Sequence, residues 1–337
     1  MARLFWALGI VLLSTVPANR VQAAPAMRKI VVAYAAMNAR VAPLWVARDL
    51  GFFTKYGVQG ETLFVRGAPT LVGAMTAGDI DVGYTGGTAV IGAAAGGSDL
   101  KILAALTNRV TYDLVVRPEI KTPEDLRGKT FGVQSIGGTV WMGAILGLEH
   151  LGLNPERDKI NIIVAGDQTV LAQAVATGTI DATVLDGVQS RRLQTMGFPI
   201  LAALAKANLP ILSTGIVARE SYIKKSPEVL ESVMKALIEG LAFSLSPAQK
   251  PETLKIVRKY LKVDPQSAEE GYKDMVIGFD RKPYPSTKAV INIVRLMQTR
   301  NPKVAKIKPD DVIKDDILRK LDETGFIDEV YAKYGVK

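Results

Sequence analysis

The sequence MTAGDID at residues 75–81 returns as VATGTID at residues 175–181, and this self-similarity decides the expected fold. The match continues to Gly87 and Gly187. Repetition at a fixed spacing indicates that one structural unit occurs twice. A spacing of about 100 residues is too long for a solenoid, so it predicts two similar lobes. A chance likeness between Gly- and Ala-rich segments is the alternative.

Each copy has the pattern strand, helix, strand, helix, strand. Short β-rich runs open the copies at residues 30–33 and 130–133, and amphipathic helices are expected at about 42–56 and 138–150. Gly78 and its counterpart in the second copy fit the position just after a helix, where the left-handed backbone suits glycine. Strands that alternate with helices predict an α/β fold, with a parallel sheet covered on both faces in each lobe.

The chain after the second copy predicts how the lobes are connected. Residues 209–218 are expected to form a strand that returns across a hinge, with residues 111–116 as its outgoing partner. Mostly helices are expected beyond it. This divides the chain into a discontinuous lobe, residues 28–113 plus 214–337, and an inserted lobe, residues 117–210. Two crossings between lobes make a hinge.

The first 23 residues have the pattern of a secretory signal peptide. Arg3 precedes an apolar run at residues 4–16, and VQA at residues 21–23 has small or apolar residues where a signal peptidase cleaves. The run is too short to cross about 30 Å of hydrocarbon as a helix. Cleavage after Ala23 predicts an exported, periplasmic chain of 314 residues with a charge of +7 (+9 without Arg3 and Arg20). An uncleaved membrane anchor is the alternative.

The composition excludes several classes of site. The chain has no cysteine, which rules out disulfides, a thiol nucleophile, a zinc–thiolate centre and a lipidated cysteine. It has one histidine, so a His-rich metal site is not possible. A net charge of +9 suits an anionic small molecule better than nucleic acid. We therefore expect no metal, no cofactor and no nucleic-acid partner.

Ligands of open α/β sheets bind at the carboxyl ends of the strands, where loops lead into helices. These loops are rich in Gly, Ser, Thr and Asn, and backbone N–H groups in a first helical turn are free donors. Several such helix starts around one cleft make an anion site without lysine or arginine. The loops are residues 35–40, 67–70 and 85–88 in the first lobe and 135–139, 166–169 and 186–187 in the second. For any one loop, a plain cap and tight turn is the simpler interpretation.

Some larger side chains near these loops have two possible roles. Trp45, Tyr84, Tyr112 and Trp141 are expected to pack in the core or hinge, with a flanking role around a ligand as the alternative. Arginines 40, 66 and 109 are expected to be solvated, with a bidentate contact to an acid as the alternative. His150, at a helix end, is expected to stabilise the helix C-terminus rather than to act in catalysis.

Three segments resemble one family. LWVARDLGFFTKYGV at residues 44–58, AGDID at residues 77–81 and DLRGKTFGV at residues 125–133 resemble periplasmic solute-binding proteins for nitrate, sulfonates, taurine and thiamine-precursor pyrimidines. The resemblance runs from about residue 28 to 245. It implies a type II periplasmic-binding-protein fold with two lobes and two hinge crossovers. It also implies a monomer without catalytic residues that holds a small ligand between its lobes and delivers it to the permease of an ABC importer.

The resemblance also implies where the ligand is held. Carried over by position, the ligand-binding residues are Asn38, Gly67, Ala68, Thr85, Gly86, Gly138, Thr139 and Asp186. Asp186 is an awkward neighbour for a purely anionic ligand, since it accepts hydrogen bonds and carries negative charge. It is expected to accept from a ligand amine or hydroxyl, with the cap of a turn as the alternative. It argues against inorganic nitrate and leaves room for a zwitterion or a polar ring. A small organic anion such as a sulfonate or carboxylate is the first expectation.

Three other functions remain as alternatives. One is a binding protein for pyrimidine-type thiamine precursors, and another is a periplasmic ligand-sensing module. The third is an enzyme on the same fold, such as the fungal thiamine-pyrimidine synthases or the porphobilinogen-polymerising deaminases. Both of those enzyme groups depend on cysteines, which are absent here.

Overall fold

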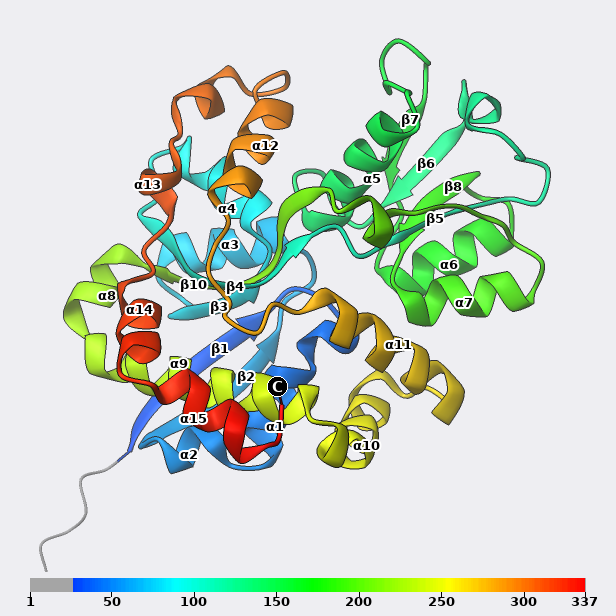
Figure 1. Cartoon of the computed structure of the whole chain (residues 1–337). Coiled ribbons are helices and arrows are strands. Elements are labelled where there is room, and N and C mark those ends of the chain that lie inside the picture. Colours follow the sequence, from blue (N-terminus) through cyan, green and yellow to red (C-terminus); the bar gives the residue numbers. More distant parts are fainter. Residues whose placement is uncertain (1–26, 337) are drawn as a thin grey trace, which may run out of the picture.

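Two five-stranded sheets form the centres of two lobes that lie side by side (Figure 1). The computed structural model describes residues 27–336, so the leader expected at residues 1–23 lies outside the described residues. Lobe I contains β1 (Arg28–Tyr34), β2 (Val58–Phe64), β3 (Val82–Thr85), β4 (Leu100–Arg109) and β10 (Pro210–Arg219). Lobe II contains β5 (Asp113–Val116), β6 (Thr130–Val133), β7 (Asn161–Val164), β8 (Ala182–Leu185) and β9 (Ile200–Ala203).

The two sheets have the same topology. Their strand orders are β2-β1-β3-β10-β4 and β7-β6-β8-β5-β9. In each sheet the second strand pairs in parallel with both neighbours, and the fourth pairs antiparallel with both of its neighbours. The sequence repeat therefore corresponds to two equivalent half-sheets. The expectation of purely parallel sheets is wrong for β5 and β10, because each of these strands enters its sheet from the other lobe.

Two chain segments cross between the lobes. The first links β4 to β5, and the second links β9 to β10 through the 3₁₀ turn η3 (Leu204–Ala207). The segments are bonded to each other, since Val110 N donates to Leu209 O at 2.9 Å. The strand expected at 209–218 is present as β10, and the outgoing crossing expected at 111–116 leads into β5. The two strands do not pair with each other, since β10 pairs with β3 and β4, whereas β5 belongs to the other sheet. The apolar pattern marks both segments as strands and carries no information about pairing.

Helices cover both faces of each sheet, as Figure 1 shows for lobe I. One face of the lobe I sheet carries α1 (Ala42–Asp49), α2 (Phe52–Lys55), α9 (Pro227–Leu245), α10 (Lys250–Leu261), α14 (Asp316–Glu323) and α15 (Phe326–Lys333). The other face carries α3 (Ala68–Ala77), α4 (Gly87–Ala94), α12 (Thr287–Met297) and α13 (Pro309–Val312). Lobe II has α5 (Thr139–His150), α6 (Gln168–Ala176) and α7 (Gly187–Thr195). The remaining helical segments are α8 (Glu220–Lys225), α11 (Pro265–Gly278), η1 (Ala39–Val41), η2 (Pro123–Leu126), η4 (Pro247–Gln249) and η5 (Pro302–Lys306).

Glycines end helices where the sequence predicts it. Gly78 and Gly178 have φ angles of 97° and 78°, which only glycine adopts without strain. Gly51, with φ of 73°, also interrupts the helix expected at 42–56, so that region forms two short helices, α1 and α2.

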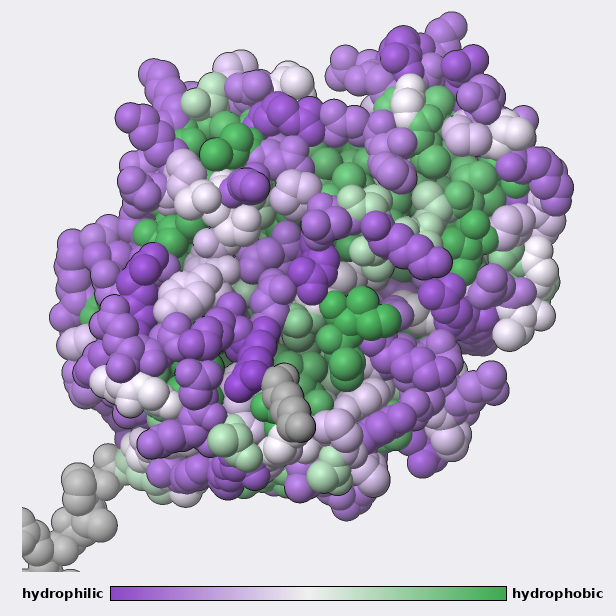
Figure 2. Space-filling view, in the orientation of Figure 1, coloured by the Kyte–Doolittle hydropathy of each residue, from purple (hydrophilic) through white to green (hydrophobic). Residues whose placement is uncertain are grey.

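The hydrophobic core is continuous through the hinge. Buried side chains of lobe I such as Leu71 belong to the same apolar cluster as Phe131 of lobe II, and the cluster runs through the hinge residues Tyr112 and Leu212. A second cluster, around Trp45, fills the other face of the lobe I sheet. Figure 2 shows that the outer surface is mainly hydrophilic, with apolar side chains gathered over lobe II and beside the junction of the lobes.

The lobes also touch away from the hinge. Helix α11 of lobe I packs against α7 of lobe II. The approach is close, because a Cβ atom added at Gly271 on α11 would lie 2.7 Å from Val188 Cγ2 on α7. The cleft between the lobes is therefore bounded by the hinge on one side and by α11 on the other. Among residues 27–336, the structure contains no helix of the length and apolar character needed to cross a membrane.

Candidate functional site

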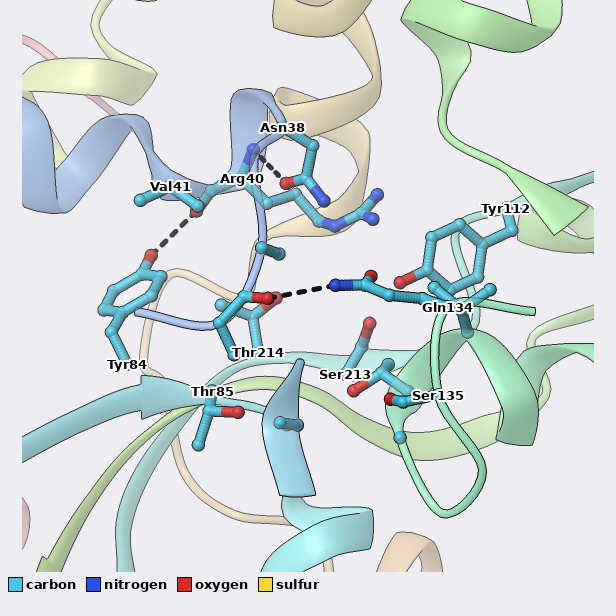
Figure 3. A pocket seen from close by; sticks show the side chains of 17 residues that line it. Asn38, Arg40, Val41, Tyr84, Thr85, Tyr112, Gln134, Ser135, Ser213 and Thr214 are labelled. Carbon is cyan, nitrogen blue, oxygen red and sulfur yellow. Dashed lines mark hydrogen bonds between the residues drawn. The ribbon is translucent and has the colours of Figure 1, made fainter. Parts of the chain in front are cut away.

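A cavity lies between the lobes where the strand ends meet, and we call it the inner cavity (Figure 3). Its volume is about 40 Å³, which is room for a few waters or one compact polar group. Both lobes and the hinge contribute to its wall. The lining residues are Ala35, Ala36, Asn38, Arg40, Val41, Ala68, Tyr84, Thr85, Gly86, Tyr112, Gln134, Ser135, Gly138, Thr139, Val140, Ser213 and Thr214.

Three helices begin at the inner cavity without a side-chain cap. The N-cap residues of α3, α4 and α5 are Gly67, Gly86 and Gly138, none of which has a side chain to accept from the first-turn N–H groups. Those N–H groups carry the positive end of the helix dipole. Two of the helices belong to lobe I and one to lobe II, so the three meet only when the lobes are together. The arrangement favours negative charge in the cavity.

Arg40 places a buried cation beside these helix ends. It lies in η1, 3% exposed, where Asn38 Oδ1 accepts from Arg40 N at 3.1 Å and Tyr84 Oη donates to Arg40 O at 2.8 Å. Its guanidinium lies over the Tyr112 ring, 4.7 Å from the centroid, and Nη1 donates to Thr111 Oγ1 at 2.8 Å. Arg40 Nη2 is buried and has no partner. A buried guanidinium with a free donor is well suited to bind an acidic group.

Two hydroxyls in the same wall are also unpartnered. Thr85 Oγ1 and Ser213 Oγ are buried and make no hydrogen bond. Buried polar groups in folded proteins are nearly always satisfied, so orphaned groups that share one cavity indicate a bound polar ligand. Gln134 of lobe II also crosses the cavity, where its Nε2 donates to Ala35 O of lobe I at 3.3 Å (Figure 3).

Three acidic side chains that do not line the inner cavity lie near Arg40. Burial raises the pKa of Asp186, and burial likewise raises the pKa of Asp274 on α11 to about 6, while Arg40 opposes both shifts. Asp113 is buried too, where it accepts from Ser190 Oγ at 2.6 Å and lies 3.3 Å from Arg191 Nη1. Asp113 on β5 and Asp186 at the start of α7 belong to lobe II, whereas Asp274 on α11 belongs to lobe I. Closure of the lobes therefore brings the three carboxylates together around Arg40.

The structure brings six of the eight predicted ligand-binding positions together. The six that line the inner cavity are Asn38, Ala68, Thr85, Gly86, Gly138 and Thr139. Gly67 does not line it, but a Cβ added there would lie 3.6 Å from Ser135 Oγ, so it lies just behind the wall. Asp186 also lies outside the inner cavity, where it caps α7 by accepting from Gln189 N at 3.2 Å.

The three arginines near the predicted loops lie in different environments. Arg40 is buried, so the expectation of a solvated side chain is wrong for it, whereas Arg66 remains largely exposed. Arg109 is partly exposed and pairs with Asp280 at 3.1 Å.

The aromatic residues divide between core and cavity. All four aromatic residues are buried in the core or hinge, as expected, and Tyr84 and Tyr112 also line the inner cavity. His150 is exposed at the last position of α5.

Sequence reasoning missed Gln134, Ser213 and Thr214 as lining residues. Gln134 directly precedes a predicted loop, and the two hydroxyl residues interrupt the apolar run of β10. These hydroxyls are the sequence signal for a polar patch inside a buried strand. Within the described part of the chain, no group of three or more His, Cys, Asp or Glu side chains is placed to hold a metal ion.

Known proteins are similar to this chain in sequence or in architecture. A family model described as NMT1/THI5 like matches residues 38–250. A Bacillus subtilis protein named as a binding protein, YtlA, is 27% identical over 255 residues, which is 73% of this chain and 76% of that protein. The periplasmic nitrate-binding protein NrtA from Synechocystis superimposes with a TM-score of 0.73 at 16% identity, covering 89% of this chain and 90% of NrtA.

A second solved structure has the same fold. The periplasmic aliphatic sulphonate binding protein SsuA from Escherichia coli superimposes with a TM-score of 0.69 at 18% identity, covering 87% of this chain and 99% of SsuA. At such identities the structural likeness shows the fold alone. The fold is the two-lobed α/β architecture of periplasmic binding proteins.

Proposed function

The chain belongs to the NMT1/THI5-like family, and from this premise we propose that it is the solute-binding protein of an ABC-type importer. In this proposal it captures a small organic anion in the inner cavity and delivers it to a membrane permease. As the name of its relative YtlA indicates, its role is binding rather than catalysis. Export to the periplasm, directed by the leader expected at residues 1–23, is part of the proposal.

The observation that carries the proposal is the set of unsatisfied polar atoms in one cavity. Arg40 Nη2, Thr85 Oγ1 and Ser213 Oγ are buried without partners, and the uncapped starts of three helices face the same space. A compact anion such as a sulfonate or carboxylate supplies acceptors to all of these donors. Its charge is also favourable beside a guanidinium and helix N-termini.

Capture follows from the division of the site between two lobes. Thr85 comes from lobe I and Thr139 from lobe II, while Ser213 comes from a hinge strand. A ligand that contacts both lobes gains its full set of hydrogen bonds only in the closed form, so it shifts the population towards closure. Two direct contacts accompany closure: the Gln134 bond to Ala35 and an ion pair between Arg66 and Asp167 at 3.3 Å. The closed outline is then what a permease recognises.

The test is isothermal titration calorimetry of the purified mature chain with sulfonates, carboxylates, nitrate and pyrimidine precursors. We expect one organic anion class to bind. Arg40→Gln removes the free donor and the charge, and a hydrogen bond to a charged group contributes about 1.5–3 kcal/mol, so the Kd should rise about 10- to 100-fold. Arg258→Gln, at an exposed position on α10, is the matched control and should bind as the unmodified chain does.

Two results would count against the proposal. One is the absence of binding by every anion in the panel. The other is an Arg40→Gln variant that is folded, as judged by circular dichroism, and binds the anion as tightly as the unmodified protein.

A further inference from the structure

A second cavity lies at the mouth of the cleft, and we call it the outer chamber. Its volume is about 530 Å³, more than tenfold that of the inner cavity. Asn38 lines both, so the two spaces are adjacent. The outer chamber also lies between the lobes, because Phe64 and Tyr260 of lobe I face Val188 of lobe II across it. A ligand that fills only the inner cavity leaves this space empty.

The helix ends at the outer chamber differ from those at the inner cavity. Helices α6 and α7 start here, and each is capped by an aspartate. Asp167 Oδ1 accepts from Val170 N at 3.2 Å, and Asp186 Oδ1 accepts from Gln189 N at 3.2 Å. The carboxylates satisfy the first-turn N–H groups and offset the positive helix ends. Helix starts that attract anions therefore surround the inner cavity, whereas helix starts already neutralised by acids surround the outer chamber.

A residue in the wall of the outer chamber, Gln189, carries an unpartnered acceptor. Gln189 is 8% exposed, and its Oε1 is buried without a hydrogen bond. The other amide atom, Nε2, is 3.5 Å from Thr169 Oγ1, at the limit of a hydrogen bond. Asp186, which is 5% exposed, adds buried carboxylate oxygens to the same wall. A buried acceptor without a donor costs free energy that a ligand N–H group would recover.

The basic residues of the outer chamber do not reverse this preference. Arg66 is paired with Asp167 at 3.3 Å, and Arg192 and Lys262 are exposed to solvent. Apolar side chains such as Met37 and Phe64 also line the outer chamber and suit a hydrocarbon spacer. The two cavities thus differ in the groups they suit: the inner cavity suits an anion, and the outer chamber suits a hydrogen-bond donor.

We propose that the outer chamber is a second subsite that holds the amine or amide end of an elongated ligand whose acidic head occupies the inner cavity. The proposal rests on the proposed function and narrows its ligand class to chain-like acids with a hydrogen-bond donor at the far end. Gln189 and Asp186 are the residues that select for the donor.

The test is calorimetry of the mature protein with two series of probes, n-alkanesulfonates and ω-aminoalkanesulfonates of increasing chain length, together with their carboxylate counterparts. At the chain length that spans the two cavities, the ω-amino probe should bind about tenfold more tightly than its alkyl analogue. Gln189→Leu should reduce this ratio to about one. Gln194→Leu, at an exposed position of the same helix, is the matched control and should keep the ratio.

The outcomes separate the two proposals. If alkyl and amino probes bind equally at every length, or if Gln189→Leu retains the ratio, the second subsite is overturned while the anion-binding function stands. If no probe of either series binds, the proposed function itself fails. Should Gln189→Leu not fold, Asp186→Asn is the second variant, because asparagine still caps a helix but lacks the charge; it must also lower the ratio.

Discussion

Asp274→Asn should stabilise the protein at neutral pH and have no effect near pH 4. Asp274 lies on α11 of lobe I and its carboxylate packs over Gly187 at the start of α7, so closely that a Cβ at Gly187 would overlap it. Burial raises the pKa of Asp274 to about 6, with Arg40 opposing the shift and Asp186 adding to it. The other charged groups that act on this carboxylate are Asp113 of β5 and Arg191 of α7.

The direction of the effect follows from proton linkage. The folded protein keeps the Asp274 proton up to pH about 6, whereas the unfolded chain loses it near 3.8. Folding therefore takes up a proton between these values, and stability falls as the pH rises through that window. The difference corresponds to about 3 kcal/mol at 1.36 kcal/mol per pKa unit, which is an upper limit because α11 can shift to admit water. Asparagine cannot ionise, so the variant avoids this destabilisation.

The assay is urea unfolding followed by circular dichroism at several pH values from about 4 to 8. The stability difference between Asp274→Asn and the unmodified protein should grow from nothing near pH 4 to about 1–3 kcal/mol above pH 6. Asp310→Asn, at an exposed carboxylate of α13, is the control and should give no pH-dependent difference. A difference that is constant across the range, or a variant less stable than the parent at pH 7, would refute the reasoning.

Three further predictions concern closure, stability and export. Gly86→Ala would place a Cβ against Thr139 Oγ1 of the other lobe, so we expect a larger radius of gyration by small-angle X-ray scattering and a Kd for the bound anion at least about tenfold higher; unchanged values would contradict this. Glu239→Gln should lower the free energy of unfolding by about 1–3 kcal/mol at pH 7 in urea titrations, because the buried Glu239 carboxylate accepts from two lysines and two tyrosines. Burial opposes ionisation of Glu239, but hydrogen bonds from Lys333 and the other partners favour the charged form and lower its folded pKa to about 2. The loss of stability in the variant should therefore become smaller as the pH falls below 4.5, the pKa of the unfolded chain. A loss that does not change with pH would argue against this reasoning. Mass spectrometry of a periplasmic extract should find a mature chain that begins at Ala24. A chain in that extract that still begins at Met1 would contradict the expected cleavage.

Local sequence patterns predict much of the fold and of the inner cavity. The repeat at residues 75–81 and 175–181 corresponds to two sheets of identical strand order. The loops at the strand ends are also where the cavity forms, because parallel strands in one sheet place their carboxyl ends on one edge. Glycine at the starts of α3, α4 and α5 is visible in the sequence, and the expectation of an anionic ligand rests on it. The division of the chain at residues 113–117 and 210–214 stays a prediction.

Other features depend on contacts between distant segments. Arg40 has the same local surroundings as a surface arginine, but Tyr112 from the hinge and the acids of α7 and α11 enclose it. The pairing of β10 with β4 rather than with residues 111–116 likewise depends on which lobe each strand enters.

The sequence by itself determined the two-lobed α/β fold, the hinge strand and the glycines at the helix starts around the inner cavity, because these features follow from periodicity, glycine placement and helix starts. Only the tertiary structure decided that Arg40 is buried, that Asp274 of α11 lies among the acids near Arg40 and that Gln134 bridges the lobes. The reason is that burial and hydrogen-bond partners depend on residues 70 to 230 positions apart in the chain, about which a local pattern carries no information.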